Sequence, residues 1–169
     1  LEPMVSHCSS GEDETLPNEV IATISDLARN RYRRFLSRTR ELNLLSKSDF
    51  LQIDSCRSES LSLLYLAMHE EFTNEDTDHL NSIPMTKYIL AVLFISWNGM
   101  LWVGNKRWLS NFDVCDWYGV ECNAQNEIVS LYLSRNEVSG TIPKEISLLC
   151  ALENLRLDAN HANSITSRR

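Results

Sequence analysis

Glycine is scarce in this sequence, and the common phosphate-binding loops are absent. The 169 residues include five glycines, at positions 11, 99, 104, 119 and 140. No two of them have the GxG spacing of a dinucleotide loop, and no GxxxxGK phosphate loop can be written because Asn105 follows Gly104. The sequence also has no nucleophile elbow, and His69-Glu70-Glu71 lacks the second histidine of a HExxH zinc helix. We therefore expect no enzyme activity, no cofactor and no metal ion.

Long hydrophobic runs are absent as well. The longest nearly apolar run, Tyr88–Trp97, contains ten residues, which is about half of what a transmembrane helix needs. The sequence thus predicts no transmembrane segment. It begins with Leu1 and shows no positively charged and then apolar leader, so we expect a fragment from which any targeting segment is missing.

An excess of basic charge is also lacking, since the formal net charge is −7. Residues 1–84 hold 15 acidic against 8 basic residues, whereas residues 85–169 hold 8 of each. Such a chain is not attracted to nucleic acid by its overall field. Six arginines nevertheless fall between positions 29 and 40. This basic helix, predicted over 18–40, is a candidate for membrane association; the alternative is a solvated face balanced by acidic residues elsewhere.

Hydrophobic periodicity divides the first half of the chain. Residues 1–17 are polar and acidic and predict a disordered lead-in. Apolar residues at three- and four-residue steps predict helices over 18–40 and 58–72, and a third helix after Pro84 that stops at Asn98-Gly99. The predicted organisation is a lead-in (1–17), a helical region (18–84), a tryptophan-rich cap (85–127) and a repeat region (128–165).

The second half contains a dense aromatic cluster and a repeat. All four tryptophans lie within residues 97–117, which suits a small cap that must seal apolar surface with few side chains. Residues 128–136 align with residues 152–160 at a spacing of 24, and both follow the pattern LxxLxLxxN, with Ile128 at the first leucine position of the earlier copy. Alternation along each copy predicts a short strand with leucines inward, and an asparagine that bonds the backbone of the following turn.

These motifs resemble the plant-type leucine-rich repeat. Residues 136–143 have the pattern NxVxGxIP, and residues 115–122 match the CxWxGVxC of the N-terminal cap of that family. The resemblance implies an α/β fold in which the helical N-terminal region is followed by the capped start of a leucine-rich repeat solenoid with short parallel strands. It also implies a disulfide between Cys115 and Cys122. The residues expected to have structural roles are Trp108, Trp117, Gly119, Asn136, Gly140, Pro143 and Asn160.

The five cysteines leave at least one without an intramolecular partner. With Cys115 and Cys122 paired as the family implies, we expect Cys150 to be a buried free thiol. Cys8 and Cys56 are expected to stay free or to pair loosely.

The resemblance implies a recognition module that binds a protein or peptide ligand on the concave strand face and is not catalytic in this fragment. The outward residues expected to bind are Ser130, Tyr132, Ser134, Asn154, Arg156 and Asp158. The alternative is a structural segment that caps and tethers a longer receptor-like or receptor-kinase array. The expected cap disulfide predicts an extracellular or membrane-associated location in the secretory pathway.

Overall fold

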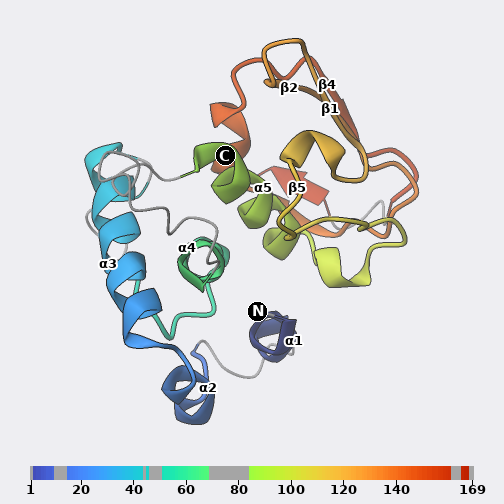
Figure 1. Ribbon diagram of the computed structural model, residues 1–169. Helices are drawn as coiled ribbons and strands as arrows, with labels where there is room; N and C mark the ends of the chain where they lie inside the picture. Colours follow the sequence, from blue (N-terminus) through green and yellow to red (C-terminus); the bar gives the residue numbers. More distant parts are fainter. Residues whose placement is uncertain are drawn as a thin grey trace. The chain divides into compact units, whose positions relative to one another are not determined.

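The computed structural model describes residues 2–9, 15–43, 45, 51–68, 84–160 and 165–167. The chain divides into two compact units, residues 1–88 and residues 89–169. Each unit is built around its own set of buried residues, and the two are described separately below. Figure 1 labels the elements of both units.

The first unit is helical. Its helices are α1 (Glu2–Ser9), α2 (Asn18–Ala22), α3 (Asp26–Glu41) and α4 (Ser58–Met68). Helices α3 and α4 pack together, and α3 contributes Tyr32 and Phe35, which are buried on the face that the periodicity predicted.

The N-terminal part of this unit differs from the expectation in two ways. The residues expected to form a disordered lead-in include the helix α1, which carries Cys8, and a disulfide joins Cys8 to Cys56. The expected single helix over 18–40 is interrupted, because the Ser25 hydroxyl accepts a hydrogen bond from the Ala28 backbone N–H at 3.2 Å and begins α3 as an N-cap. The last residues of the helix expected over 58–72 lie outside the described residues.

Helix α5 (Met85–Ser96) begins directly after Pro84 and ends before Asn98, as the sequence predicted. Most of it belongs to the second unit, where short 3-10 turns follow it: η3 (Gly99–Leu101) and η4 (Val114–Asp116). Its side chains from Tyr88 to Leu93 are almost fully buried. A helix that is apolar on nearly every side is expected to be enclosed in this way.

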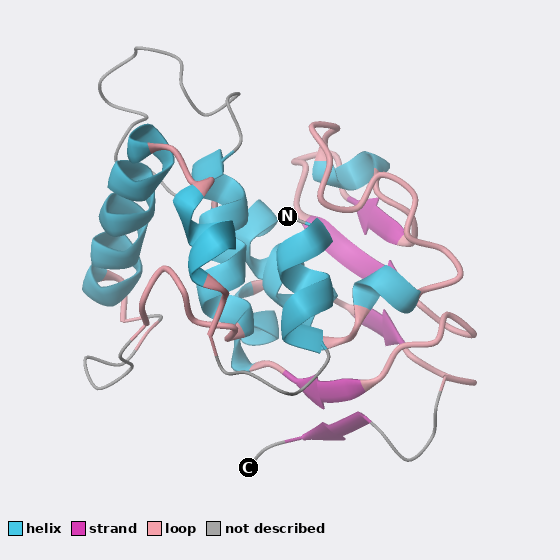
Figure 2. Ribbon diagram, turned by 90° about the horizontal axis from the view of Figure 1, so that it is seen from below, coloured by secondary structure: helices cyan, strands magenta, loops and turns pink. Residues whose placement is uncertain are grey.

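The second unit also contains two small sheets (Figure 2). Strand β1 (Val120–Cys122) pairs antiparallel with β2 (Ile128–Tyr132), and β2 pairs parallel with β4 (Asn154–Arg156). Strand β3 (Gly140–Ile142) pairs parallel with β5 (Ile165–Ser167), and the 3-10 turn η5 (Lys144–Leu148) follows β3. The parallel pair β2–β4 matches residues 24 positions apart, such as Leu131 and Leu155, and so reproduces the period of the sequence.

The expected solenoid is not what the described residues form, and that prediction of fold class was wrong. Helices and a three-stranded mixed sheet are present, so the chain is mixed α/β, but one of the two strand pairings in that sheet is antiparallel. The physical reason lies in the number of repeats. A solenoid needs about three stacked repeats to bury a continuous core. Here Leu131 and Leu133 are fully buried, whereas Leu155, the counterpart of Leu131, is 37% exposed.

Candidate ligand-binding face

Tryptophan rings form an aromatic cluster in the part of the second unit that precedes β2. Trp102, Trp108 and Trp117 contact one another in sequence, with ring centroids 5.0 Å apart for the first pair and 5.3 Å for the second. Phe94 of α5 adds ring contacts to Trp102 and Trp108 at 5.2 and 5.8 Å. Such aromatic pairs contribute about 0.5–1.5 kcal/mol each beyond the area that they bury.

Each indole N–H of this cluster is bonded to a backbone carbonyl. Trp108 donates to the Tyr118 carbonyl at 2.8 Å, and Trp117 donates to the Phe112 carbonyl at 3.2 Å. Trp97 and Trp102 likewise donate, at 3.0 and 2.9 Å. These bonds satisfy the buried indole N–H groups and fix the rings relative to the backbone around them.

A disulfide closes the loop of the cap next to β1. Cys115 and Cys122 are bonded to each other, seven residues apart. Between them, Gly119 has a φ of +78°, and a Cβ atom there would collide with the backbone carbonyl oxygen of Tyr132. Gly140 has a φ of +112°, and a Cβ atom there would collide with the Ser96 carbonyl oxygen. Both glycines therefore permit a close backbone approach that a larger residue would prevent.

Two asparagines hold the turns that follow β2 and β4. The Asn136 side chain is 2% exposed. Its Oδ1 accepts from the Gly104 N–H at 2.6 Å, and its Nδ2 donates to the Gly104 carbonyl at 3.1 Å. Asn160 accepts from the N–H groups of Asn136 and Val138 at 2.7 and 3.1 Å, and donates to the carbonyls of Leu133 and Leu157 at 2.7 and 2.9 Å. These amides satisfy backbone groups that the turns would otherwise leave unpaired.

Pro143 precedes η5 and stands at its N-cap position, with φ −72°. The fixed φ of proline suits this entry into a helical turn. Cys150 lies farther along the return segment and is a free thiol, but it is exposed. The expectation of a buried thiol was therefore wrong.

The residues expected to bind a ligand lie along β2 and β4 and in the turns that follow, and they meet in pairs across the sheet. Asn154 Nδ2 donates to Ser130 Oγ at 3.4 Å, and the Arg156 guanidinium lies 5.5 Å from the centroid of the Tyr132 ring. Beyond the strand ends, Ser134 Oγ donates to Asp158 Oδ1 at 2.6 Å. This hydrogen bond lowers the pKa of the Asp158 carboxyl below its ordinary value of 3.8.

Their accessibility is not uniform. Asn154, Arg156 and Asp158 are exposed, whereas Tyr132 and Ser134 are half-buried. Ser130 is 3% exposed, so the expectation that it faces solvent was wrong. Its short side chain stands on the central strand between partners on both sides, and the larger Asn154 amide contacts it.

Glu121 extends the face beyond the residues that the sequence indicated. It pairs with Ser130 across the antiparallel strands β1 and β2, and residues opposite each other in a sheet project to the same side. Glu121 is exposed. The alternation of apolar Val120 with charged Glu121 could have indicated a strand with Glu121 on its exposed side. The antiparallel pairing of that strand with β2, which places Glu121 beside Ser130, was not expected.

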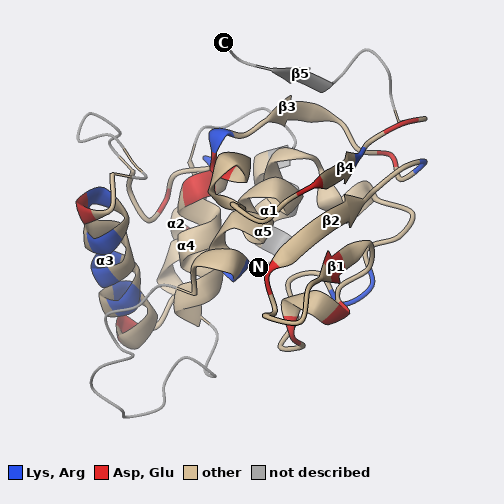
Figure 3. Ribbon diagram, turned by 90° about the horizontal axis from the view of Figure 1, so that it is seen from above, with Lys and Arg blue, Asp and Glu red and all other residues tan. Residues whose placement is uncertain are grey.

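The six arginines of the basic helix do not share one exposed surface. Figure 3 shows the basic residues along α3. Arg33, Arg34 and Arg38 are exposed, and Arg38 forms an ion pair with Glu41 at 2.8 Å. Arg31 is 7% exposed. In the part of the chain that the structure describes, no helix is long and apolar enough to cross a membrane.

The comparisons with known proteins agree with part of the resemblance. A probable leucine-rich repeat receptor-like protein kinase of Arabidopsis thaliana is 40% identical over 58 residues, which are 33% of this chain and 6% of the kinase. The chain thus spans a small fraction of the length of this relative. No protein-family model and no solved structure matches. Part of the chain is therefore related to a leucine-rich repeat protein, and the match covers 33% of the chain.

Proposed function

We propose that this chain is a non-catalytic recognition module that binds a protein or peptide on the exposed side of β2 and β4. The observation that carries the proposal is the set of side-chain pairs across these strands, in which Arg156 lies over Tyr132 and Ser134 bonds Asp158. Tyrosine and arginine are the side chains that most often anchor protein interfaces. Their mutual contact reduces the side-chain freedom that a ligand would otherwise have to restrict.

The pattern of charge on this face suggests the chemistry of the ligand. Arg156 offers guanidinium donors, Asp158 offers a carboxylate, and Asn154 offers an amide, all of them exposed. An extended peptide that carries both an acidic and a basic side chain could pair with the first two. The aromatic ring of Tyr132 would supply apolar contact area between them.

A peptide-display selection against the full chain tests this function. We expect recovered peptides to protect residues of β2 and β4 from amide hydrogen exchange, and to bind at least tenfold more weakly to the variant Tyr132→Ala/Arg156→Ala. Lys144→Ala is the matched control, because Lys144 is exposed in η5 and lies outside the sheet. Equal affinity of the double variant and the wild type would refute the proposal.

A structural role is the second candidate, and the exposed leucines favour it. Leu148 is 36% exposed and Leu155 is 37% exposed, although both are large and apolar. In this role the segment would cap and tether a neighbouring part of a longer protein through these residues. Normal ligand binding by a longer chain in which Tyr132 and Arg156 are both replaced would favour it.

We also propose that the chain is located in the secretory pathway, where it is either extracellular or associated with a membrane. The support is the pair of disulfides, because such bonds persist in oxidising compartments. Mass spectrometry of the protein from its native source, alkylated before reduction, tests the location. Alkylation of Cys150 alone is expected, and alkylation of the other four cysteines would place the chain in a reducing compartment.

A further inference from the structure

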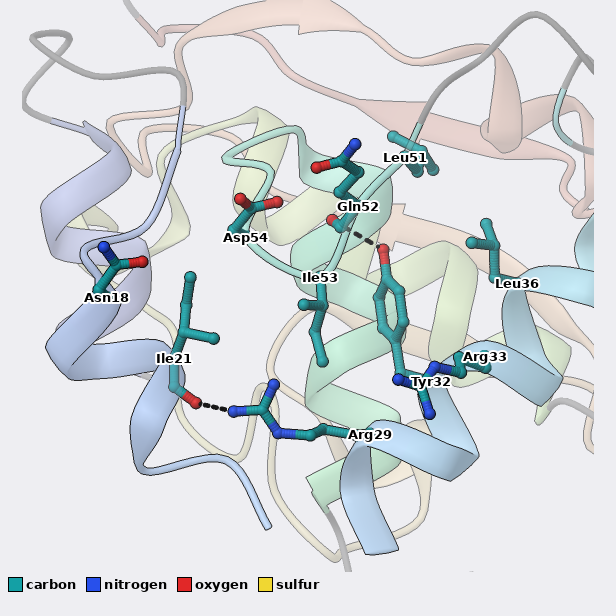
Figure 4. Close-up of a pocket in the computed structure, with 10 residues that line it drawn as sticks. All are labelled: Asn18, Ile21, Arg29, Tyr32, Arg33, Leu36, Leu51, Gln52, Ile53 and Asp54. Carbon is teal, nitrogen blue, oxygen red and sulfur yellow. Dashed lines mark hydrogen bonds between the residues drawn. The ribbon is translucent and has the colours of Figure 1, made fainter. Parts of the chain in front are cut away.

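The first unit contains a pocket that the recognition function does not use. It has a volume of about 430 Å³ and lies between α2, α3 and residues 51–54 (Figure 4). Pockets of roughly 300–1,000 Å³ are the usual size for small-molecule sites. The apolar lining comes from Ile21, Leu36, Leu51 and Ile53.

Hydrogen bonds hold one wall of this pocket in place. Figure 4 shows Tyr32 pointing at the Gln52 carbonyl. The Tyr32 hydroxyl lies 3.0 Å from that carbonyl oxygen and 2.7 Å from Ser60 Oγ, which itself donates to the same carbonyl at 2.7 Å. Burial raises the pKa of the Tyr32 phenol above its ordinary value. The ring is therefore a neutral and immobile part of the pocket, and its binding groups are already engaged.

Two arginines supply the charge of the pocket. Arg29 Nε donates to the Ile24 carbonyl at 3.0 Å, and a second guanidinium nitrogen donates to the Ile21 carbonyl at the end of α2. These bonds orient Arg29, and in the part of the chain that the structure describes its other N–H groups have no hydrogen-bond partner. Arg33 Nη1 donates to Asn30 Oδ1 at 3.1 Å and is otherwise exposed.

Among the described residues that line the pocket, Asp54 is the one acidic residue against the two arginines. Of the carboxylates in the described ranges, none forms an ion pair with Arg29 or Arg33. The pocket therefore combines an apolar interior with two guanidinium groups that have unused donors, which is the arrangement that suits an amphipathic anion.

We propose that this pocket binds a small amphipathic carboxylate. The apolar body of the ligand occupies the space lined by Ile21, Leu36 and Ile53, and its carboxylate accepts hydrogen bonds from Arg33, with Arg29 adding positive charge nearby. Guanidinium groups bind carboxylates with paired, charge-assisted hydrogen bonds. This site is separate from the strand face in both residues and chemistry, and it does not depend on peptide recognition.

Isothermal titration calorimetry of the full chain with octanoate and with octanol tests the site. The two probes share an alkyl chain and differ in charge, so their difference in affinity measures the contribution of the arginines. We expect octanoate to bind saturably and roughly tenfold more tightly than octanol. A tenfold difference is at the low end of what charge-assisted hydrogen bonds contribute, because Arg33 is exposed and its charge is screened by water. Arg33→Gln should remove most of this difference, with the remainder due to Arg29, and should leave the octanol affinity unchanged, whereas Arg33→Lys should retain part of what Arg33→Gln removes.

Two further variants keep the test specific. Arg34→Gln is the matched control, since Arg34 is the neighbouring exposed arginine on α3 and does not line the pocket. It should bind both probes as the wild type does. Ile53→Trp fills the pocket and should abolish binding of both probes while circular dichroism shows an unchanged helix content. The proposal is overturned if octanoate fails to saturate, if octanol binds equally well, or if either response survives Ile53→Trp.

Discussion

Asn136 permits a sharp test of how the cap is joined to the strands. Its buried amide makes two hydrogen bonds to the backbone of Gly104, which lies 32 residues earlier in the cap. Alanine at position 136 would remove both bonds and leave the N–H and the carbonyl of Gly104 without these partners. Other hydrogen bonds, such as that from Asn98 Nδ2 to Ser139 Oγ at 2.9 Å, also join the cap to this turn, but the Asn136 amide is the group that bonds the backbone of Gly104.

The magnitude follows from the number of orphaned groups. Each buried polar group that loses its partner costs about 1–3 kcal/mol, and Gly104 is half-buried, so water can reach it in part. We therefore expect Asn136→Ala to lower the free energy of unfolding by about 2–4 kcal/mol. With a urea m-value of about 2 kcal/mol/M, the midpoint should fall by about 1–2 M.

Urea unfolding followed by tryptophan fluorescence is the appropriate assay. All four tryptophans lie in residues 97–117, so the signal reports on the second unit. Asn154→Ala is the matched control, because Asn154 is exposed and makes one weak hydrogen bond of 3.4 Å. It should change the stability by less than about 0.5 kcal/mol. If Asn136→Ala costs no more than this control, the amide does not join the cap to the strands and the reasoning fails.

Three other predictions concern separate parts of the chain. The double variant Cys8→Ser/Cys56→Ser should lower the free energy of unfolding of the first unit by about 4 kcal/mol, because the disulfide closes a loop with a sequence separation of 48. A loss below about 1 kcal/mol, measured by thermal unfolding, would contradict this expectation. Arg31→Met should leave the melting temperature unchanged or raise it, because within the described residues this buried guanidinium makes one long hydrogen bond, of 3.4 Å. A marked fall in the melting temperature would contradict the idea that its burial is unfavourable. NMR titration should find the pKa of Asp158 below 3.8, and Ser134→Ala should return it toward that value. Since the folded-state pKa is lowered, the stabilisation is present above the ordinary value and is lost as the pH falls through the lowered pKa.

Several features of the site could be predicted from the residues because they depend on short-range order. The 24-residue spacing of Leu131 and Leu155 sets the parallel register of β2 and β4. Alternation along β2 separates buried leucines from Tyr132, and the position of Asn136 after the strand places an amide at the turn. These outcomes follow from backbone geometry, which a local pattern encodes directly.

Other features could not be predicted, because they depend on what covers each residue in three dimensions. The pairing of Cys8 with Cys56 joins segments 48 residues apart, and no spacing in the sequence indicates it. The fold class was wrong for a related reason: the repeat pattern specifies how one strand pairs with the next, but not whether enough repeats follow to make a solenoid.

The residue pattern is enough to predict the helices α3 to α5 in outline, the register of β2 with β4 and the positions of the turn asparagines. Packing in three dimensions determines which side chains are accessible, since it buries Ser130 and exposes Leu155 and Cys150, and it forms the pocket beside Arg29 and Arg33. The division has one physical cause. The side-chain periods of helices and strands follow from the backbone geometry of residues close together in the chain. Burial and cavities depend instead on how segments distant in the chain pack together.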